Sequence, residues 1–255
     1  MLGQHICCRL KTDANIAETL ERRRLVAATV LEQGRAFDLL GFGLADTHMQ
    51  MVTASDGGAE LARRVEISLS ARFKGPGFMT VDVRPVEKQW HLYNALTYDL
   101  RQVVHHRVHA VDPYFEGTNL PDLLGLRLTG RYTRELVLRK LPRLPDEDLL
   151  QILGLTCLEP ADGPLERVVE AGAAAICLPR RTLTGRSVQV IRARRAVIEV
   201  VGSRLSTTLI APLLGVNRTT INRLRKEPAS QLYVDAIRLQ LGLWRAKPVS
   251  AGPDR

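Results

Sequence analysis

A histidine and a glutamine lie two positions apart in the apolar stretch FGLADTHMQMVTA, residues 42–54. Successive side chains of a β-strand point to opposite faces, so His48 and Gln50 share one face if this stretch is extended. Divalent cations such as Mg²⁺ and Mn²⁺ accept imidazole nitrogen and amide oxygen. The spacing suits part of a metal site, but two ligands are too few. By itself the pair is weak evidence, because a histidine beside a core more often has a structural role.

A second pair of residues with related chemistry occurs in ALTYDLRQ, residues 95–102. Tyr98 and Gln102 are four positions apart and lie on one face if the segment is helical. Gln102 would add an oxygen ligand beside a phenol, whereas a tyrosine at helical spacing is more often part of a core. The nearby His105, His106 and His109 could form another metal cluster, but a solvated or phosphate-facing helix end is favoured.

The elements that must position these residues follow from the periodicity of residues 1–126. Alternating and helical patterns occur in the order β-α-β-β-α-β-α, with Pro85 expected at the start of the last helix. This order predicts an α+β fold with one antiparallel sheet and helices packed on it. The expected segments are a strand over 4–10, a helix over 17–35, two strands within 36–55, a helix over 58–73, a strand over 78–85 and a helix over 86–108.

The N-terminal half also resembles a family of DNA-processing enzymes. HICCR is similar to a first strand of the form H-V-T-S-R, and GFGLADTHMQMV matches in spacing a metal-binding strand like A-Y-C-L-M-P-N-H-V-H-L-L. LYNALTYDLRQV follows the helix pattern L-L-N-C-L-R-Y-I-E-L-N-P with its tyrosine in register, and DPYFEGTNLPDLLG is similar to Y-P-W-S-S-Y-x-D-L-L-G. From His5 to about Gly125, the chain resembles the REP-associated tyrosine transposases of the HUH endonuclease class, which are specific for single-stranded DNA.

This resemblance implies a fold, a site and a reaction. The fold would be the ferredoxin-like HUH fold over residues 1–126. His48 and Gln50 would take the places of the family's paired metal-binding histidines, with Gln102 as the third ligand of Mg²⁺ or Mn²⁺. Tyr98 would be the nucleophile that attacks a DNA phosphodiester and forms a phosphotyrosine intermediate. A tyrosine has a pKa of about 10, so it needs a metal that polarises the phosphate.

The basic charge of the chain is concentrated near its C-terminus. The chain has a formal net charge of +9, but residues 180–247 hold 14 Lys and Arg against 3 Asp and Glu, or +11. Residues 1–179 hold 21 against 23, or −2. Clustered positive charge is typical of nucleic-acid-binding modules, because each contact with a phosphate releases a counterion. The alternative is a generic basic surface.

The C-terminal segment has the pattern of an all-α helix-turn-helix domain, residues 181–247. SVQVIRARRAVIEVVGSR predicts a helix with a basic face, and STTLIAPLLGVNRTTINRLRKE predicts a short apolar helix, a turn at Gly215 and a second polar helix capped by Asn217. A polar helix after such a turn also occurs in helical bundles, and Pro212 is unusual inside the first helix. The predicted DNA-binding residues are Arg192, Arg194, Arg195, Asn217, Arg218, Thr219, Thr220, Asn222 and Arg223.

The same segment resembles the DNA-binding domain of the bacterial replication initiator DnaA. VIRARRAVIEVVGSRLSTTLIAPLLGVNRTTINRL is similar to its basic helix followed by a helix-turn-helix, and NRTT stands where that family has D-H-S/T-T. The resemblance implies binding to duplex DNA. Between the two domains, residues 127–180 are predicted to be a basic and helical connector, because two short helical patterns follow LPRLPDED.

Several classes of protein are disfavoured. The first residues show no charged start followed by a long apolar run, and the small-residue run AGAAAICL is too short for a membrane span. We therefore expect a soluble, cytoplasmic protein with no membrane partner. The two resemblances imply a bacterial protein associated with the nucleoid. The four cysteines include no C-x-x-C pair, which favours reduced thiols without a chemical role.

Two functional hypotheses remain. The first is a transposase-like enzyme, a monomer or homodimer, that nicks and joins single-stranded or hairpin DNA while its C-terminal domain holds duplex DNA. The second is a domesticated, inactive transposase that acts as a sequence-specific DNA-binding regulator. Gln50 in place of a second histidine, and RQVVHHRVH in place of the family's Asn-Pro turn, favour the second. The retained Tyr98 and Gln102 favour the first.

Overall fold

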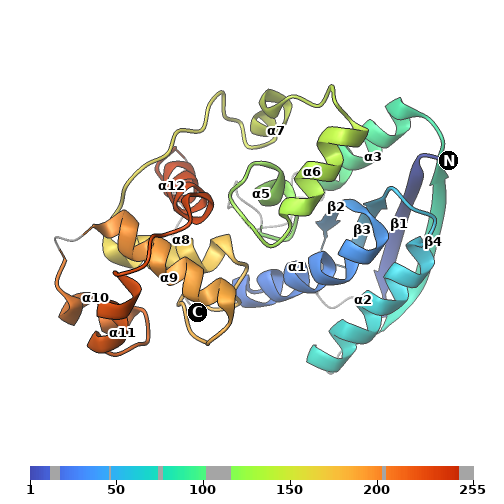
Figure 1. Cartoon of the computed structure of the whole chain (residues 1–255). Coiled ribbons are helices and arrows are strands. Elements are labelled where there is room, and N and C mark those ends of the chain that lie inside the picture. The colour runs from blue at the N-terminus through green and yellow to red at the C-terminus, as the bar shows by residue number, and fades with distance from the viewer. Residues whose placement is uncertain (12–17, 46, 74–76, 102–115, 203–204, 247–255) are drawn as a thin grey trace. The chain divides into compact units, whose positions relative to one another are not determined.

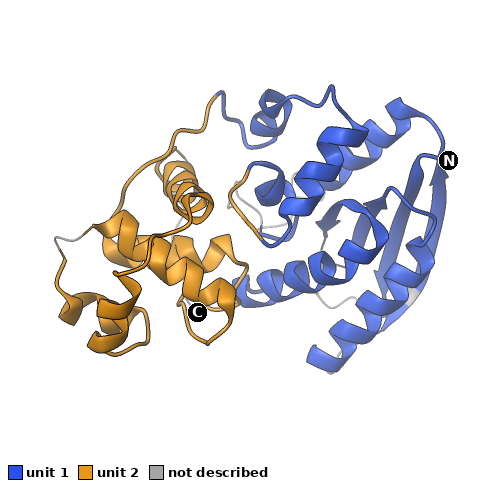
Figure 2. Ribbon diagram, in the orientation of Figure 1, with its two compact units in different colours: residues 1–124, 129–156 blue, residues 125–128, 157–255 orange. Residues whose placement is uncertain are grey.

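The computed structural model describes residues 1–11, 18–45, 47–73, 77–101, 116–202 and 205–246 (Figure 1). The chain divides into two compact units (Figure 2). The N-terminal unit comprises Met1–Leu124 and Thr129–Thr156, and the C-terminal unit comprises Gly125–Leu128 and Cys157–Arg255.

The N-terminal unit is built on a four-stranded antiparallel sheet. Its strands are β1 (Gly3–Leu10), β2 (Leu39–Leu44), β3 (His48–Thr53) and β4 (Phe78–Val86), in the spatial order β2-β3-β1-β4. Strand β1 pairs with β3 on one side and β4 on the other, and its Cys7 lies opposite Gln50 of β3 and Asp82 of β4. The predicted α+β class with an antiparallel sheet is confirmed.

Helices cover both faces of the sheet, but one face only in part. Helices α1 (Leu20–Gly34) and α2 (Gly58–Phe73) pack against each other and on one face, where Gly58 lies against Ile6. Helix α3 (Gln89–Leu100) packs on β2 and β3 from the opposite face, where Gly41 meets Leu96. On that face, α3 leaves side chains of β1 and β4 accessible.

The entry into α3 differs from the sequence prediction. Pro85 does not begin a helix: it lies in β4 opposite Gln4, and α3 begins at Gln89. β4 is an edge strand in the sheet, and a proline is tolerated in an edge strand because its missing N–H need not pair.

The segment that follows α3 in the described chain closes the N-terminal unit against β2. Asn119 accepts a hydrogen bond from the Phe42 backbone N–H (3.0 Å) and donates one to the Leu40 carbonyl (2.9 Å). Glu116 forms a buried ion pair with Arg24 of α1 (2.8 Å). The helices of this segment are α5 (Leu120–Leu123), α6 (Arg131–Lys140) and α7 (Asp146–Ile152). Earlier in the chain, a short 3-10 helix, η1 (Arg35–Phe37), follows α1.

The C-terminal unit is helical throughout its described residues. Its core is formed by α8 (Leu165–Ala175), α9 (Val188–Val201) and α12 (Gln231–Ala246), which pack pairwise, and by two short helices, α10 (Thr207–Leu213) and α11 (Arg218–Leu224). The segment 127–180 expected to connect two domains is divided between the units, because α6 packs on β2 whereas α8 packs on α9 and α12.

Candidate functional site

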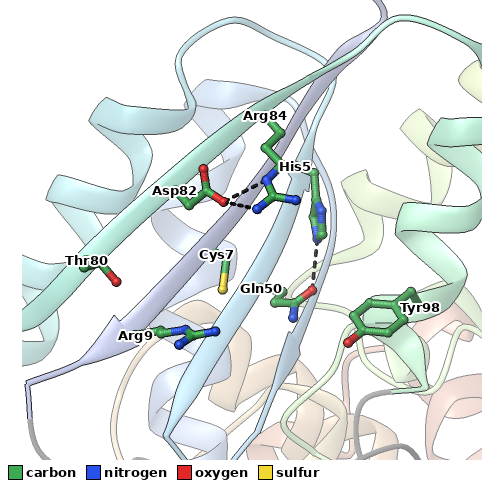
Figure 3. A pocket seen from close by; sticks show the side chains of 8 residues that line it. All are labelled: His5, Cys7, Arg9, Gln50, Thr80, Asp82, Arg84 and Tyr98. Atoms are coloured by element: carbon green, nitrogen blue, oxygen red, sulfur yellow. Dashed lines mark hydrogen bonds and ion pairs between the residues drawn. The ribbon is translucent and has the colours of Figure 1, made fainter.

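A cavity of about 490 Å³ opens on the face of the sheet that α3 covers only in part (Figure 3). Strand alternation explains its lining: on β1, the apolar Ile6, Cys8 and Leu10 are buried, while the intervening side chains face the cavity. The lining residues are His5, Cys7 and Arg9 of β1, Gln50 of β3, Thr80, Asp82 and Arg84 of β4, and Tyr98 of α3.

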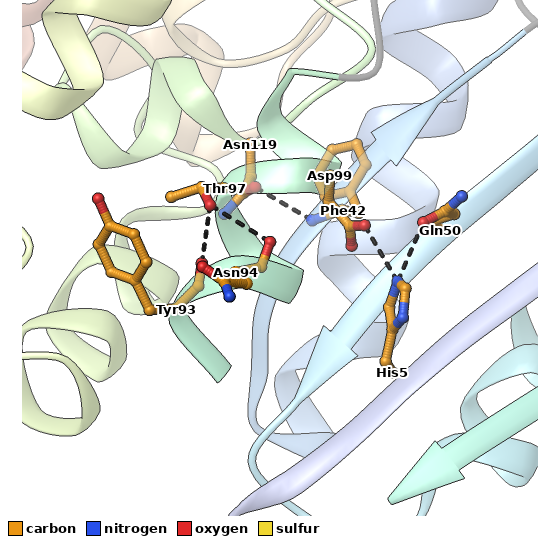
Figure 4. A network of polar contacts seen from close by, with 8 residues as sticks. All are labelled: His5, Phe42, Gln50, Tyr93, Asn94, Thr97, Asp99 and Asn119. Atoms are coloured by element: carbon orange, nitrogen blue, oxygen red, sulfur yellow. Dashed lines mark hydrogen bonds and ion pairs between the residues drawn. The ribbon is translucent and has the colours of Figure 1, made fainter. Parts of the chain in front are cut away.

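Three polar side chains from three elements meet beside this cavity (Figure 4). His5 Nε2 lies 3.0 Å from Gln50 Oε1 and 3.2 Å from Asp99 Oδ1. Asp99 is 0% exposed, and its second oxygen, Oδ2, has no hydrogen-bond partner among the described residues. A buried carboxylate with one unpartnered oxygen is costly, so this arrangement calls for a functional explanation.

The protonation of this cluster is shifted by its surroundings. Burial raises the pKa of Asp99 to about 6, although the hydrogen bond and the charge of His5 work in the opposite direction. Burial lowers the pKa of His5, but the hydrogen bond and charge of Asp99 and the hydrogen bond of Gln50 outweigh it, so that this pKa is raised. The folded protein therefore holds protons at this pair more tightly than a solvated Asp and His would.

Tyr98 lies at the edge of the cavity and outside the hydrophobic core. Its side chain is 37% exposed, and Figure 3 shows its hydroxyl directed into the cavity on the side of Gln50. Arg84 donates to Asp82 (2.7 Å), and Arg9 lines the cavity from β1. A phenol, two guanidinium groups and an amide thus border one open cavity.

The predicted metal ligands are placed only in part. Gln50 lines the cavity with Tyr98, whereas His48 begins β3 opposite Arg9 and is not among the described residues of the lining. Gln102 and the three histidines at 105, 106 and 109 lie outside the described residues. Within the described part of the chain, no group of three or more His, Cys, Asp or Glu side chains could hold a metal ion.

Two residues of the cluster are absent from the sequence predictions. His5 belongs to a polar row of alternating residues on β1, which is a weak signal by itself. Asp99 gives a stronger one, because Leu92, Leu96 and Asp99 have the spacing of a buried helix face and all three are buried. An acidic residue in such a position is unusual enough to mark a site.

The predicted DNA-contacting helix has the expected polar surface. Asn217 Oδ1 accepts a hydrogen bond from the Thr220 backbone N–H (2.8 Å) and caps α11, and Gly215 in the preceding turn has φ 59°. Ile221 and Leu224 are buried, so α11 has a single apolar side. The exposed residues are Asn217, Arg218, Thr219, Asn222 and Arg223, while Thr220 is half-buried.

The three arginines predicted on the basic helix differ in their surroundings. Arg192 of α9 is exposed. Arg194 is 6% exposed, and its guanidinium donates two hydrogen bonds to the Leu183 carbonyl (3.1 and 2.7 Å). Arg195 is half-buried and forms an ion pair with Glu227. Arg194 therefore has a structural role in holding the Leu183 carbonyl, and Arg192 is available at the surface. DNA contact by these arginines stays a prediction.

Comparison of the chain with models of known protein families, with characterised proteins and with solved structures gives no match. Among the described residues, no helix combines the length and the apolar character needed to cross a membrane.

Proposed function

We propose that this protein is a tyrosine-dependent DNA nicking and joining enzyme of the HUH type. The observation that carries the proposal is that Tyr98 and Gln50, from separate elements, border one open cavity. The order β1-α1-β2-β3-α2-β4 supports the ferredoxin-like version of the α+β fold, in which such a sheet leaves one face available. The substrate would be single-stranded or hairpin DNA.

The reaction is a transfer of a phosphoryl group to tyrosine. The Tyr98 oxygen would attack the phosphorus of a DNA phosphodiester and form a new P–O bond, while the bond to one deoxyribose oxygen breaks. The phenolic proton leaves Tyr98, and the released deoxyribose oxygen takes up a proton. The reverse attack by a deoxyribose hydroxyl rejoins the strand. Arg9 and Arg84 would attract the phosphate to the cavity that they line.

A divalent cation, Mg²⁺ or Mn²⁺, is part of this proposal. The donor chemistry near Gln50 fits such an ion, since an amide oxygen, an imidazole nitrogen and a buried carboxylate oxygen lie together. When bound, the ion would polarise the phosphate and offset the charge that develops on it. The family resemblance implies a different set beside Gln50, namely His48 and Gln102.

The C-terminal unit would hold duplex DNA. The short helices α10 and α11, the turn at Gly215 and the exposed Arg218, Asn222 and Arg223 support a helix-turn-helix that presents α11 to base edges. Such a protein would act on the bacterial nucleoid, with the C-terminal unit as the anchor for the N-terminal unit.

The proposal is tested by trapping the covalent intermediate. The full chain is incubated with end-labelled hairpin oligonucleotides and Mn²⁺, and a labelled protein band is sought on a denaturing gel. Tyr98→Phe keeps the ring and removes only the hydroxyl, so we expect it to fold and to form no adduct. Tyr93→Phe is the matched control, because the Tyr93 hydroxyl donates to Asp148 (2.9 Å), and it should retain the adduct. An equal adduct in Tyr98→Phe would exclude this nucleophile.

The second candidate function is that of an inactive, DNA-binding regulator. It is favoured by the contact between Gln50 and His5, which engages the Gln50 amide oxygen with a protein side chain. If the protein binds DNA but forms no adduct with any hairpin or single strand in Mg²⁺ or Mn²⁺, this function is the better account.

A further inference from the structure

The cluster beside the cavity brings together one nitrogen and two kinds of oxygen. His5 Nε2 is within 3.0 Å of Gln50 Oε1 and 3.2 Å of Asp99 Oδ1, and these three atoms come from β1, β3 and α3 (Figure 4). A ring nitrogen carries at most one proton, so one donor here faces two acceptors. Hydrogen bonding alone accounts for the cluster incompletely.

The spacing of these atoms is also that of neighbouring ligands in a metal site. Ligands at right angles in an octahedral site, each about 2.1 Å from the ion, lie about 3.0 Å from one another. The separations of 3.0 and 3.2 Å agree with that value, as they also do with hydrogen bonds. A cation could therefore bind between these three atoms with little rearrangement of the side chains.

Asp99 supplies an independent reason for a cation. The carboxylate is 0% exposed, and its Oδ2 has no hydrogen-bond partner among the described residues. A buried anionic group is stable only when it is paired or bound to a metal, and the ion pair with His5 (3.2 Å) engages Oδ1 alone. The cationic side chain on the neighbouring strand, Arg84, is engaged by Asp82 (2.7 Å).

We propose that His5, Gln50 and Asp99 form a binding site for a divalent cation, Mn²⁺ or Mg²⁺, at the inner wall of the cavity. Carboxylate and amide oxygens suit these hard ions, and Mn²⁺ also accepts an imidazole nitrogen. His5 would bind through Nε2, with its ring proton on Nδ1. The cavity leaves room for water or a phosphate oxygen at the remaining positions.

This ligand set differs from the one predicted from the sequence. It retains Gln50 but replaces His48 and Gln102 by His5 and Asp99. The inference deepens the proposed function, on which it rests for the purpose of the ion, because a cation held here lies at the cavity that Tyr98 borders. Binding of the ion itself is a separate property that can be measured without DNA.

The test is a titration of the full chain with Mn²⁺ alone, in which the unbound ion is measured by its electron paramagnetic resonance signal. We expect His5→Gln and Asp99→Asn to weaken Mn²⁺ binding by at least about tenfold, since loss of even an outer partner of a metal ligand has that effect. The matched control is Asp82→Asn, which removes a nearby carboxylate and should change the affinity by less than about twofold. His48→Gln tests the ligand set implied by the family resemblance, and a loss as large as that in His5→Gln would contradict the set proposed here.

If His5→Gln or Asp99→Asn prevents folding, a second measurement on the unaltered protein tests the same ligand set. In the unaltered protein, substoichiometric Mn²⁺ should broaden the ring resonances of His5 in a nuclear magnetic resonance spectrum before those of His48. Absence of Mn²⁺ binding, broadening of His48 first, or equal losses in the test and control variants would each overturn the proposed ligand set.

The two proposals fail in different ways. If Mn²⁺ binds at His5 but no hairpin forms an adduct with Tyr98, the cation site stands and the enzymatic function fails. If the adduct forms while the His5 resonances are unaffected by Mn²⁺, the enzymatic function stands and this cation site is wrong.

Discussion

At the scale of single residues, the pair His5–Asp99 determines how the N-terminal unit responds to pH. The pKa of Asp99 rises from 3.8 to about 6 on burial, so the folded state binds its proton more tightly than the unfolded chain. The stability from this proton is present below pH 3.8 and is lost as the pH rises through about 6. The raised pKa of His5 acts in the same sense, because its stabilisation is present below 6.5 and is lost as the pH rises through the folded pKa.

We therefore predict that the free energy of unfolding in metal-free buffer falls as the pH rises from about 4 to about 8. The part due to Asp99 is about 3 kcal/mol, since each pKa unit corresponds to about 1.4 kcal/mol. Urea denaturation at several pH values measures it, with Asp99→Asn as the comparison. The variant should gain about 2–3 kcal/mol relative to the parent between pH 4 and pH 7, and a constant difference would contradict the assignment.

A second residue-scale prediction separates two arginines of α9. Arg194→Ala removes a buried guanidinium that donates to the Leu183 carbonyl, so we expect a loss of about 2–3 kcal/mol in the free energy of unfolding. Arg192→Ala, at an exposed position, should change it by less than about 0.5 kcal/mol. Chemical denaturation checks both values, and equal losses would contradict the difference in burial.

At the scale of elements, the position of α3 on the sheet sets the position of Tyr98. The helix approaches β2 closely because Gly41 has no side chain: a Cβ there would lie 2.2 Å from Leu96 Cδ1 and 3.2 Å from Asn119 Oδ1. Asn119 in turn is fixed by its hydrogen bonds to β2. The position of Tyr98 therefore depends on the contact between α3 and β2 at Gly41 and Leu96.

We predict that Gly41→Ala lowers the free energy of unfolding by about 1–3 kcal/mol, the usual cost of inserting a methyl group into a packed interface. It should also reduce adduct formation, because α3 must move. The control is a double-mutant cycle with Leu96→Ala, which makes room for the new methyl group. A favourable coupling of about 0.5 kcal/mol or more is expected, and additive effects would show that the clash is not the cause.

The elements themselves could largely be predicted from the sequence, because their signals are local. The period of apolar residues predicted β1, α2 and α9 close to their observed bounds. Helix α12 was not predicted, although Val234, Ile237 and Leu241 have helical spacing and are buried. The site could be predicted only in part, since the partnership of His5 with Asp99 joins residues 94 positions apart and depends on how α3 crosses the sheet.

At the scale of the whole molecule, the charge is distributed unequally along the chain. Residues 180–247 carry 14 Lys and Arg against 3 Asp and Glu, whereas residues 1–179 carry 21 against 23. We therefore expect the C-terminal unit to hold duplex DNA. In the proposed function, Arg9 and Arg84, which line the cavity of the N-terminal unit, would contact a single phosphate. In the proposed function, the C-terminal unit determines the affinity for duplex DNA and the N-terminal unit contributes to the affinity for hairpin DNA. Substitutions in each unit can separate the two affinities.

The affinity for duplex DNA can be measured with the full chain and a duplex selected from a random library. Affinity for that duplex should fall steeply with salt, because each neutralised phosphate releases about 0.9 counterion. Arg192→Ala should weaken selected and random duplexes alike and reduce the slope of log K against log[salt] by about 1, as expected for a phosphate contact.

Arg218→Ala and Arg223→Ala should instead cost about 1–3 kcal/mol on the selected duplex and less on random sequence, because both residues are exposed on α11, where they can reach base edges. Fluorescence anisotropy at several salt concentrations measures both effects. Arg9→Ala is the matched control: it removes one arginine from the cavity, so it should weaken hairpin binding and leave duplex affinity unchanged. If Arg9→Ala weakened duplex binding as much as Arg192→Ala, the assignment of duplex DNA to the C-terminal unit would be wrong, because the loss would then follow total charge and not its location.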